Sequence, residues 1–302
     1  MTRRKFRRQG TLRTPELAGR PLFSRVHLKQ PEPHGISKGR GRDSTELEFA
    51  MDLARFEIAA LESEGGNAGL VAVAKIGSLL SELPGTEEGR IWMAASTLSR
   101  IARRGSTAVG LTATAVLVSD LDTRVAQEWT DGAEAVGREL ALLASDKLAH
   151  EEIGPAAVFG MYGILSKRIE QEVENSDEKS WHEVVVEDRR YGRYTTEIFG
   201  SVALHGLIWM LETIASSFIE KPSLLAAGML SAEIENSINR TDGMKVWDAR
   251  HKANIRLQEM LKEALTNVAR IGNCHATTDF ASEMLGIYFG IQIGGRGGIT
   301  IH

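Results

Sequence analysis

The chain has 302 residues, of which 42% are hydrophobic and 25% charged, and these values are ordinary for a globular protein that buries a core. Its single cysteine, Cys274, excludes an internal disulfide framework and indicates an intracellular (cytoplasmic) setting, or the interior of a virion or other assembly. The N-terminus has no apolar region, so we expect no secretory signal peptide.

The formal net charge of −4 combines two parts of opposite sign. Residues 1–43 hold 12 Lys and Arg against three acidic residues, a net charge of +9, while the remainder holds 24 basic and 37 acidic residues, a net charge of −13. Four of the seven prolines also lie in residues 1–43, which show no sustained helical or strand period. The sequence therefore predicts a flexible basic arm at 1–43, attached to an acidic body.

The body is predicted to be all-α, with about ten helices in one large or two intimate helical subdomains. In the first, Thr45 and Glu48 have capping-box spacing and Gly65–Gly66 ends the helix. Its apolar face holds Leu47, Ala50, Met51, Ala54, Ile58 and Leu61. The other helices expected in the N-terminal half, residues 44–175, are 68–83, 86–104, a short buried helix in 106–120, 122–153, and one from Pro155 to Val173.

The charged segment 175–193 is interpreted as a joint before the C-terminal half, residues 176–290. We expect helices there at 194–220, 223–239, 244–271 and 278–290. The most apolar stretch, 200–219, carries His205 and Glu212 near its middle, so we interpret it as a buried helix and not as a membrane span. No repeat of fixed period is visible.

Residues 291–302 are predicted to be an extended C-terminal segment rich in Gly and Ile. The motif GGRGG is similar to one unit of the arginine–glycine segments that bind RNA. The alternating isoleucines equally predict a small hairpin, or a strand donated to a neighbouring subunit, and we favour such a structural role. These isoleucines are Ile291, Ile293, Ile299 and Ile301.

The basic arm is the strongest functional signal. Clustered cations bind phosphate backbones through counterion release, which needs no fixed geometry. Within residues 1–43 only Phe6 and Phe23 are aromatic, so we expect little base stacking and weak sequence specificity for RNA or DNA. The alternatives are a tail that binds nothing, a mitochondrial targeting segment, or contact with anionic lipid or an acidic protein. The predicted nucleic-acid-binding residues are Arg3, Arg4, Lys5, Arg7, Arg8, Arg13, Arg20, Arg25, Lys38, Arg40 and Arg42.

The segment RIGNCH, from Arg270 to His275, resembles the Arg and His spacing of helical ribonucleases of the HEPN class. This resemblance implies metal-independent RNA cleavage as an alternative function. Ile271 stands where the motif usually has a polar residue, and Gly272 is typical of a helix end. The same spacing also arises by chance in a chain with many arginines, so we predict no catalytic residue.

Other polar groupings are interpreted as ordinary surface or core features, and we predict no metal site and no cofactor. No Walker loop, no dinucleotide-binding glycine motif and no zinc-spaced cysteine set occurs. His205 is interpreted as a hydrogen-bonded core histidine, and Cys274 as an unactivated thiol. The groupings interpreted as solvated charges or loop residues are Asp146 with His150 and Glu151, Glu178 with His182, and Asp120 with Asp122.

Together these observations predict a non-enzymatic structural protein that binds nucleic acid and assembles as a homo-oligomer. The plan of basic arm, helical body and extended C-terminal segment resembles that of viral nucleoproteins and capsid subunits. A nucleocapsid or coat-like role is therefore the main hypothesis. The alternatives are the HEPN-type ribonuclease and a regulatory or adaptor protein that docks an acidic partner.

Overall fold

The computed structural model describes residues 43–63, 66–127, 129–174, 176, 181–188, 192–245, 248–294 and 298–301. Within these ranges the prediction of an all-α body with about ten helices is confirmed. The helices are α1 (Asp43–Glu62), α2 (Asn67–Glu82), α3 (Glu88–Arg104), α4 (Thr107–Gln127), α5 (Asp131–Ala144), α6 (Ile153–Glu174), α7 (Val202–Ala215), α8 (Glu220–Thr241), α9 (Ala249–Ile271) and α10 (His275–Phe289). Four short strands form two antiparallel hairpins, β1 (Trp181–Asp188) with β2 (Gly192–Phe199) and β3 (Ile291–Gly294) with β4 (Gly298–Ile301).

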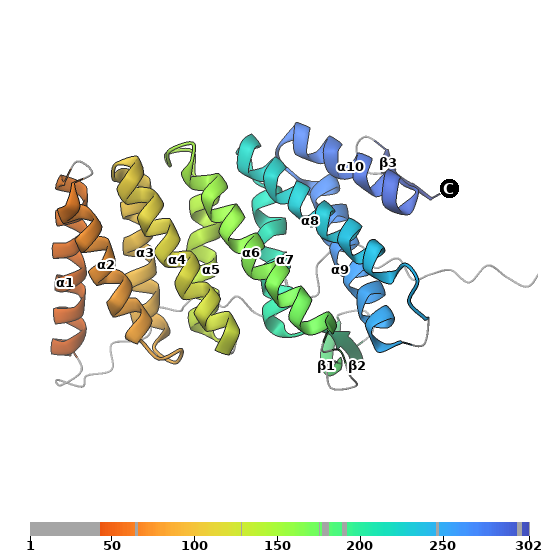
Figure 1. Cartoon of the computed structure of the whole chain (residues 1–302), viewed down its shortest axis with the longest axis horizontal. Helices are drawn as coiled ribbons and strands as arrows, with labels where there is room; N and C mark the ends of the chain where they lie inside the picture. The colour runs from red at the N-terminus through yellow and green to blue at the C-terminus, as the bar shows by residue number, and fades with distance from the viewer. Residues whose placement is uncertain are drawn as a thin grey trace, which may run out of the picture. The chain divides into compact units, whose positions relative to one another are not determined.

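The helices stack as successive pairs in two layers (Figure 1). Odd-numbered helices pack against the next odd-numbered helix, even-numbered helices against the next even-numbered one, and each helix also packs against its neighbour in the chain. The core lies between the layers, where side chains such as Ile76, Leu98, Leu117 and Leu140 are fully buried. This is the arrangement of an α-solenoid, in which each pair buries its apolar faces against adjacent pairs.

The helix pairs recur at a spacing that the sequence does not reveal. The first helices of successive pairs begin at residues 43, 88, 131, 202 and 249, so three of the four intervals are 45, 43 and 47 residues. The remaining interval is 71 residues because the β1–β2 hairpin is inserted between α6 and α7. The predicted boundary at residue 176 falls at this insertion, across which α6 packs against α7 and α8.

Two predicted helices are wrong in their bounds. The helix expected at 122–153 is divided between the end of α4 and α5, because Thr130 caps a new helix by accepting a hydrogen bond from the backbone of Ala133 at 3.4 Å. The helix expected at 194–220 begins only at Val202, since residues 192–199 form β2. Gly200 is left-handed (φ 85°) between the strand and the Ser201 cap of α7.

Helix α1 packs against its neighbours through the face opposite the one that the sequence predicts to be buried. Leu53 and Ala60 are 3% and 1% exposed, whereas Leu47, Met51 and Ile58 are 62%, 47% and 55% exposed. The helix has two apolar faces, and α2 and α3 cover only the face that holds Leu53 and Ala60. The expectation that the Leu47–Ile58 face is the inward one is therefore wrong.

A buried arginine joins the first two helix pairs. The Arg124 guanidinium donates to Asp120 Oδ2 at 2.6 Å and to the backbone carbonyls of Leu80 and Leu83 at 2.7 and 3.3 Å. Both side chains of the ion pair are less than 8% exposed. Arg124 thus adds a second donor to the Leu80 carbonyl, which also accepts from the backbone of Leu83, and fixes α4 against the end of α2.

The C-terminal segment forms the hairpin that was one of the two structures expected for it. Ile291 pairs with Ile301 and Ile293 with Ile299. Strand β3 packs against α10, where Ile291 is only 7% exposed. The first part of the segment therefore completes the core of its own chain.

Two nearby glycines of α6 give a matched test of this packing. A Cβ on Gly160 would lie 2.4, 2.8 and 3.1 Å from three side-chain atoms of Val118 on α4, whereas a Cβ on Gly163 meets nothing within 4 Å. Rotating Val118 cannot relieve all three contacts, so the two helices must move apart. We expect Gly160→Ala to lower the free energy of unfolding by about 1–2 kcal/mol.

In the same chemical denaturation series, Gly163→Ala should raise the free energy of unfolding by roughly 0.5–1 kcal/mol, because alanine has the higher helix propensity. Equal effects of the two substitutions would contradict the close approach of α4 and α6 at Gly160.

Candidate functional site

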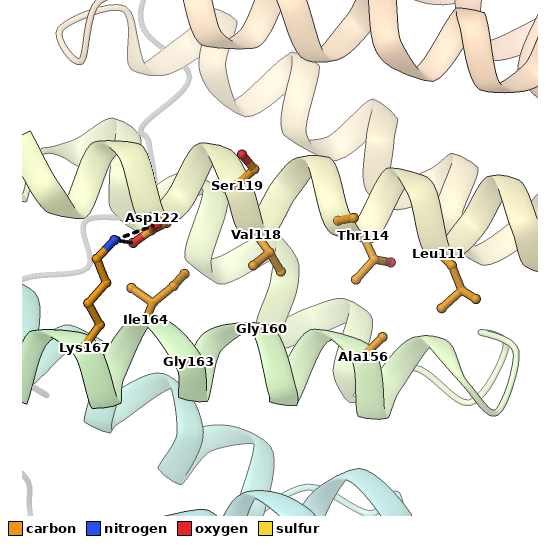
Figure 2. A pocket seen from close by; sticks show the side chains of 11 residues that line it. Leu111, Thr114, Val118, Ser119, Asp122, Ala156, Gly160, Gly163, Ile164 and Lys167 are labelled. Atoms are coloured by element: carbon orange, nitrogen blue, oxygen red, sulfur yellow. Dashed lines mark hydrogen bonds and ion pairs between the residues drawn. The ribbon is translucent and has the colours of Figure 1, made fainter.

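A groove of about 430 Å³ lies between α4 and α6 on the layer of even-numbered helices. Its walls are mostly small or apolar, with Leu111 and Val118 on α4 and Ala156 and Ile164 on α6. Figure 2 shows Asp122 and Lys167 together at one end of the groove, and Leu111 and Ala156 toward the other. Lys167 Nζ lies 3.1 and 3.0 Å from the two carboxylate oxygens of Asp122.

The two glycines of α6 have different effects on this groove. Gly160 brings α6 close to Val118, and Gly163 faces open space. The lining is therefore mostly small and apolar, and the charges of Asp122 and Lys167 at its end neutralise each other. Such a lining suits contact with apolar side chains of a partner.

Sequence reasoning missed this groove, although the sequence contains a signal for it. Residues 107–119 of α4 hold no charged side chain, yet Ala115 and Ser119 are exposed. A helix surface that is uncharged where it meets solvent is unusual for a solvated face. From the sequence alone, however, the same uncharged pattern indicates a buried helix.

The eleven basic residues predicted to bind nucleic acid lie outside the described residues, as does Glu178. Their interpretation stays a prediction from the charge pattern.

The RIGNCH segment spans the end of α9 and the start of α10. Arg270 is exposed in the last turn of α9, and His275 is 93% exposed at the first position of α10, with Nε2 3.7 Å from Asp279 Oδ2. Gly272 follows α9 as its cap residue, as the sequence predicted. Both side chains therefore lie at solvent-facing helix ends.

Cys274 lies between these two helix ends and is 8% exposed. Burial acts to raise the pKa of its thiol, but hydrogen bonds with Thr277, Ser223 and Ala276 outweigh burial, so its pKa lies below the usual value. The hydroxyls of Ser223 and Thr277 also lie 2.8 Å apart and are buried. This cluster joins the start of α10 to α8.

In the described part of the chain, no three His, Cys, Asp or Glu side chains are grouped so that they could hold a metal ion. Asp146 pairs with Arg103 at 3.0 Å, and His150 lies 3.2 Å from the carbonyl of Gly105, both from the loop between α5 and α6. Asp120 pairs with Arg124, and Asp122 with Lys167. Helices that are long and apolar enough to cross a membrane are also absent from this part of the chain.

A buried polar network joins α6, α8 and α9. The Tyr162 hydroxyl donates to Glu233 Oε1 at 3.0 Å, and Arg240 lies 3.5 Å from Glu233 Oε2. Arg240 also donates to Asn254 Oδ1 at 3.1 Å. Burial and the neighbouring Glu233 carboxylate raise the pKa of Tyr162 to about 12. The hydroxyl therefore stays protonated, and it holds a carboxylate that would be costly to bury alone.

A carboxyl group of raised pKa, that of Glu212, lies in the layer of odd-numbered helices. Burial on α7 raises the pKa of Glu212 to about 7, opposed by a hydrogen bond from Asn267 and reinforced by the charge of Glu263. Asn267 Nδ2 donates to Glu212 Oε1 at 3.0 Å and so connects α7 with α9. His205, on the same helix, is half-buried.

No protein-family model, curated protein or solved structure matches this chain.

The raised pKa of Glu212 gives a pH prediction. Between its ordinary value of 4.5 and about 7, the folded state binds a proton that the unfolded chain has released, so stability falls as pH rises through this window. Glu212→Gln stays neutral, and we expect it to raise the thermal midpoint at pH 8 by about 2–5 °C relative to the parent chain.

At pH 5 the parent carboxyl group is protonated, so the midpoints of parent and Glu212→Gln should nearly coincide. The exposed Glu170→Gln serves as the matched control, with no difference at either pH. A Glu212→Gln effect of equal size at pH 5 and pH 8 would assign the change to packing and not to titration.

Proposed function

We propose that this chain is a non-enzymatic structural protein that binds nucleic acid through residues 1–43 and assembles with copies of itself, as a nucleocapsid or coat subunit does. The observation that carries the proposal is the segregation of charge, with +9 on residues 1–43 and −13 on the remainder. Clustered cations on a separate segment bind phosphates without a folded pocket.

The acidic body gives self-assembly a physical role in this function. An acidic surface repels a phosphate backbone, so a single arm holds nucleic acid only modestly. Each further subunit brings another arm at high effective concentration, and many weak contacts then act together. A stacked helical body supports this role because it offers long rigid surfaces for contacts between subunits.

Replacing all eleven predicted arm residues by glutamine in the full chain should abolish binding to a fluorescent single-stranded RNA or DNA, measured by anisotropy. A graded comparison uses Arg3, Arg4 and Lys5 against three exposed body cations, Arg104, Lys252 and Arg270, each set replaced by glutamine. We expect the arm set to weaken binding at least tenfold and the body set to change it less than twofold. Equal losses in the two sets would refute the arm as the binding segment.

Binding should also weaken steeply with salt. If about six arm cations contact a single strand, the logarithm of the binding constant should fall against the logarithm of salt concentration with a slope near −4. Titrations at several salt concentrations give this slope directly. A slope shallower than about −1, or preferential binding of an acidic polypeptide, would favour the adaptor hypothesis instead.

A further inference from the structure

Helix α1 carries a second apolar face that no other helix in the described residues covers. It lies at one end of the helical stack, where its main contacts are with α2 and α3 (Figure 1). Arg100 of α3 holds Glu57 at 2.8 Å, and Lys75 of α2 lies over the Phe56 ring at 5.3 Å. The end helices of soluble solenoids normally turn a polar face to solvent, and α1 does not.

The exposed face has the spacing of a helix-pairing seam. Leu47, Met51, Ala54 and Ile58 follow one another at intervals of four, three and four residues, and all four are exposed. This is the alternating spacing of the core positions of a coiled coil, which suits another helix and not a flat or irregular partner. We call these four residues the α1 seam.

We infer that the α1 seam binds the α1 seam of a second copy in an antiparallel, two-fold symmetric helix pair. This rests on the self-assembly part of the proposed function and names the surface that performs it. Leu47 then packs against Ile58 of the second copy, and Met51 against Ala54.

The flanking charges select this arrangement over the other registers. Glu48 and Arg55 lie on the same edge of the seam and are both exposed; Arg55 Nη1 lies 3.4 Å from Asp52 Oδ1 on its own helix. In the antiparallel register above, Glu48 faces Arg55 of the second copy, and symmetry forms this pair twice. A register shifted by one heptad would place Arg55 next to Arg55 of the second copy. A parallel pair would place Glu57 next to Glu62 of the second copy, and both arrangements bring like charges together.

The pairing would also arrange the two basic arms. Each arm precedes Asp43, the first residue of α1. In an antiparallel pair the two Asp43 positions lie at opposite ends, roughly 30 Å apart at the rise of an α-helix. The two arms of one dimer would therefore start at separate points along a nucleic acid. The seam is small, so we expect a dissociation constant of roughly micromolar size.

The test measures the mass of the full chain, freed of nucleic acid, by light scattering over a concentration series at moderate salt. We expect a dimer at about 100 μM for the parent chain, from the micromolar estimate. Ile58→Glu should weaken the dimer at least 100-fold, because it places two carboxylates in the seam. Ile287→Glu, at a similarly exposed position on α10, should leave the mass unchanged.

The charge pair of Glu48 and Arg55 gives a more specific test within the same experiment. Glu48→Arg and Arg55→Glu should each weaken dimerisation about tenfold, and the double variant should restore it. Glu46→Arg has the same change in net charge away from the seam and is the matched control. Circular dichroism should show unchanged helix content in every variant, since all of these side chains are exposed.

A monomeric parent chain, or a double variant no better than the singles, would overturn the proposed pairing. A dimer lost only in Ile287→Glu would place the contact on α10 instead, and a dimer lost in both Ile58→Glu and Ile287→Glu would show a head-to-tail contact. Because mass is measured without nucleic acid, these outcomes are independent of the arm, whose failure would appear only in the anisotropy titrations.

Discussion

The structure depends on one packing constraint: no helix pair of this body buries its apolar surface without the adjacent pairs. Main contacts therefore run almost entirely between helices one or two places apart in the chain. Polar contacts then fix how adjacent pairs meet, as Arg124 does for α2 and α4. A stack built in this way has two incomplete ends. The C-terminal end is partly closed by β3 against α10, while α1 keeps an apolar face open.

Buried polar groups serve the stack at several joints. Tyr162 and Glu233 connect α6 and α8 within the layer of even-numbered helices, and Asn267 connects α9 to Glu212 of α7 within the other layer. Each pair satisfies groups that would otherwise be costly to bury, so these contacts specify which helices adjoin. They explain why a body with many alanines and glycines has defined helix positions. Close contacts at small residues, such as Gly160 of α6 against Val118 of α4, do not by themselves prevent one helix from sliding along the other.

The sequence predicts a helix well where a strong stop signal bounds it, as Gly65–Gly66 does for α1. It fails where two periods compete: β-branched residues at 184–186 and 195–196 form strands that were assigned to a joint and a helix. It also fails to choose between two apolar faces of α1, because periodicity does not reveal which face a neighbour covers. The repeat is invisible because the pairs share geometry and not residues. The groove could not be predicted because it depends on which glycine of α6 contacts Val118 of α4, and only the tertiary structure decides this.

The insertion of β1–β2 between α6 and α7 shows how locally this architecture is built. The layers continue across the 71-residue interval, since α5 still packs against α7 and α6 against α8. Contacts between neighbours in the chain close only short loops, and such topologies fold quickly. During synthesis, each pair of helices can therefore dock onto the pair before it while the remainder of the chain is still being made. The ribosome would release α1 first, with the whole of its open face exposed before any later helix exists.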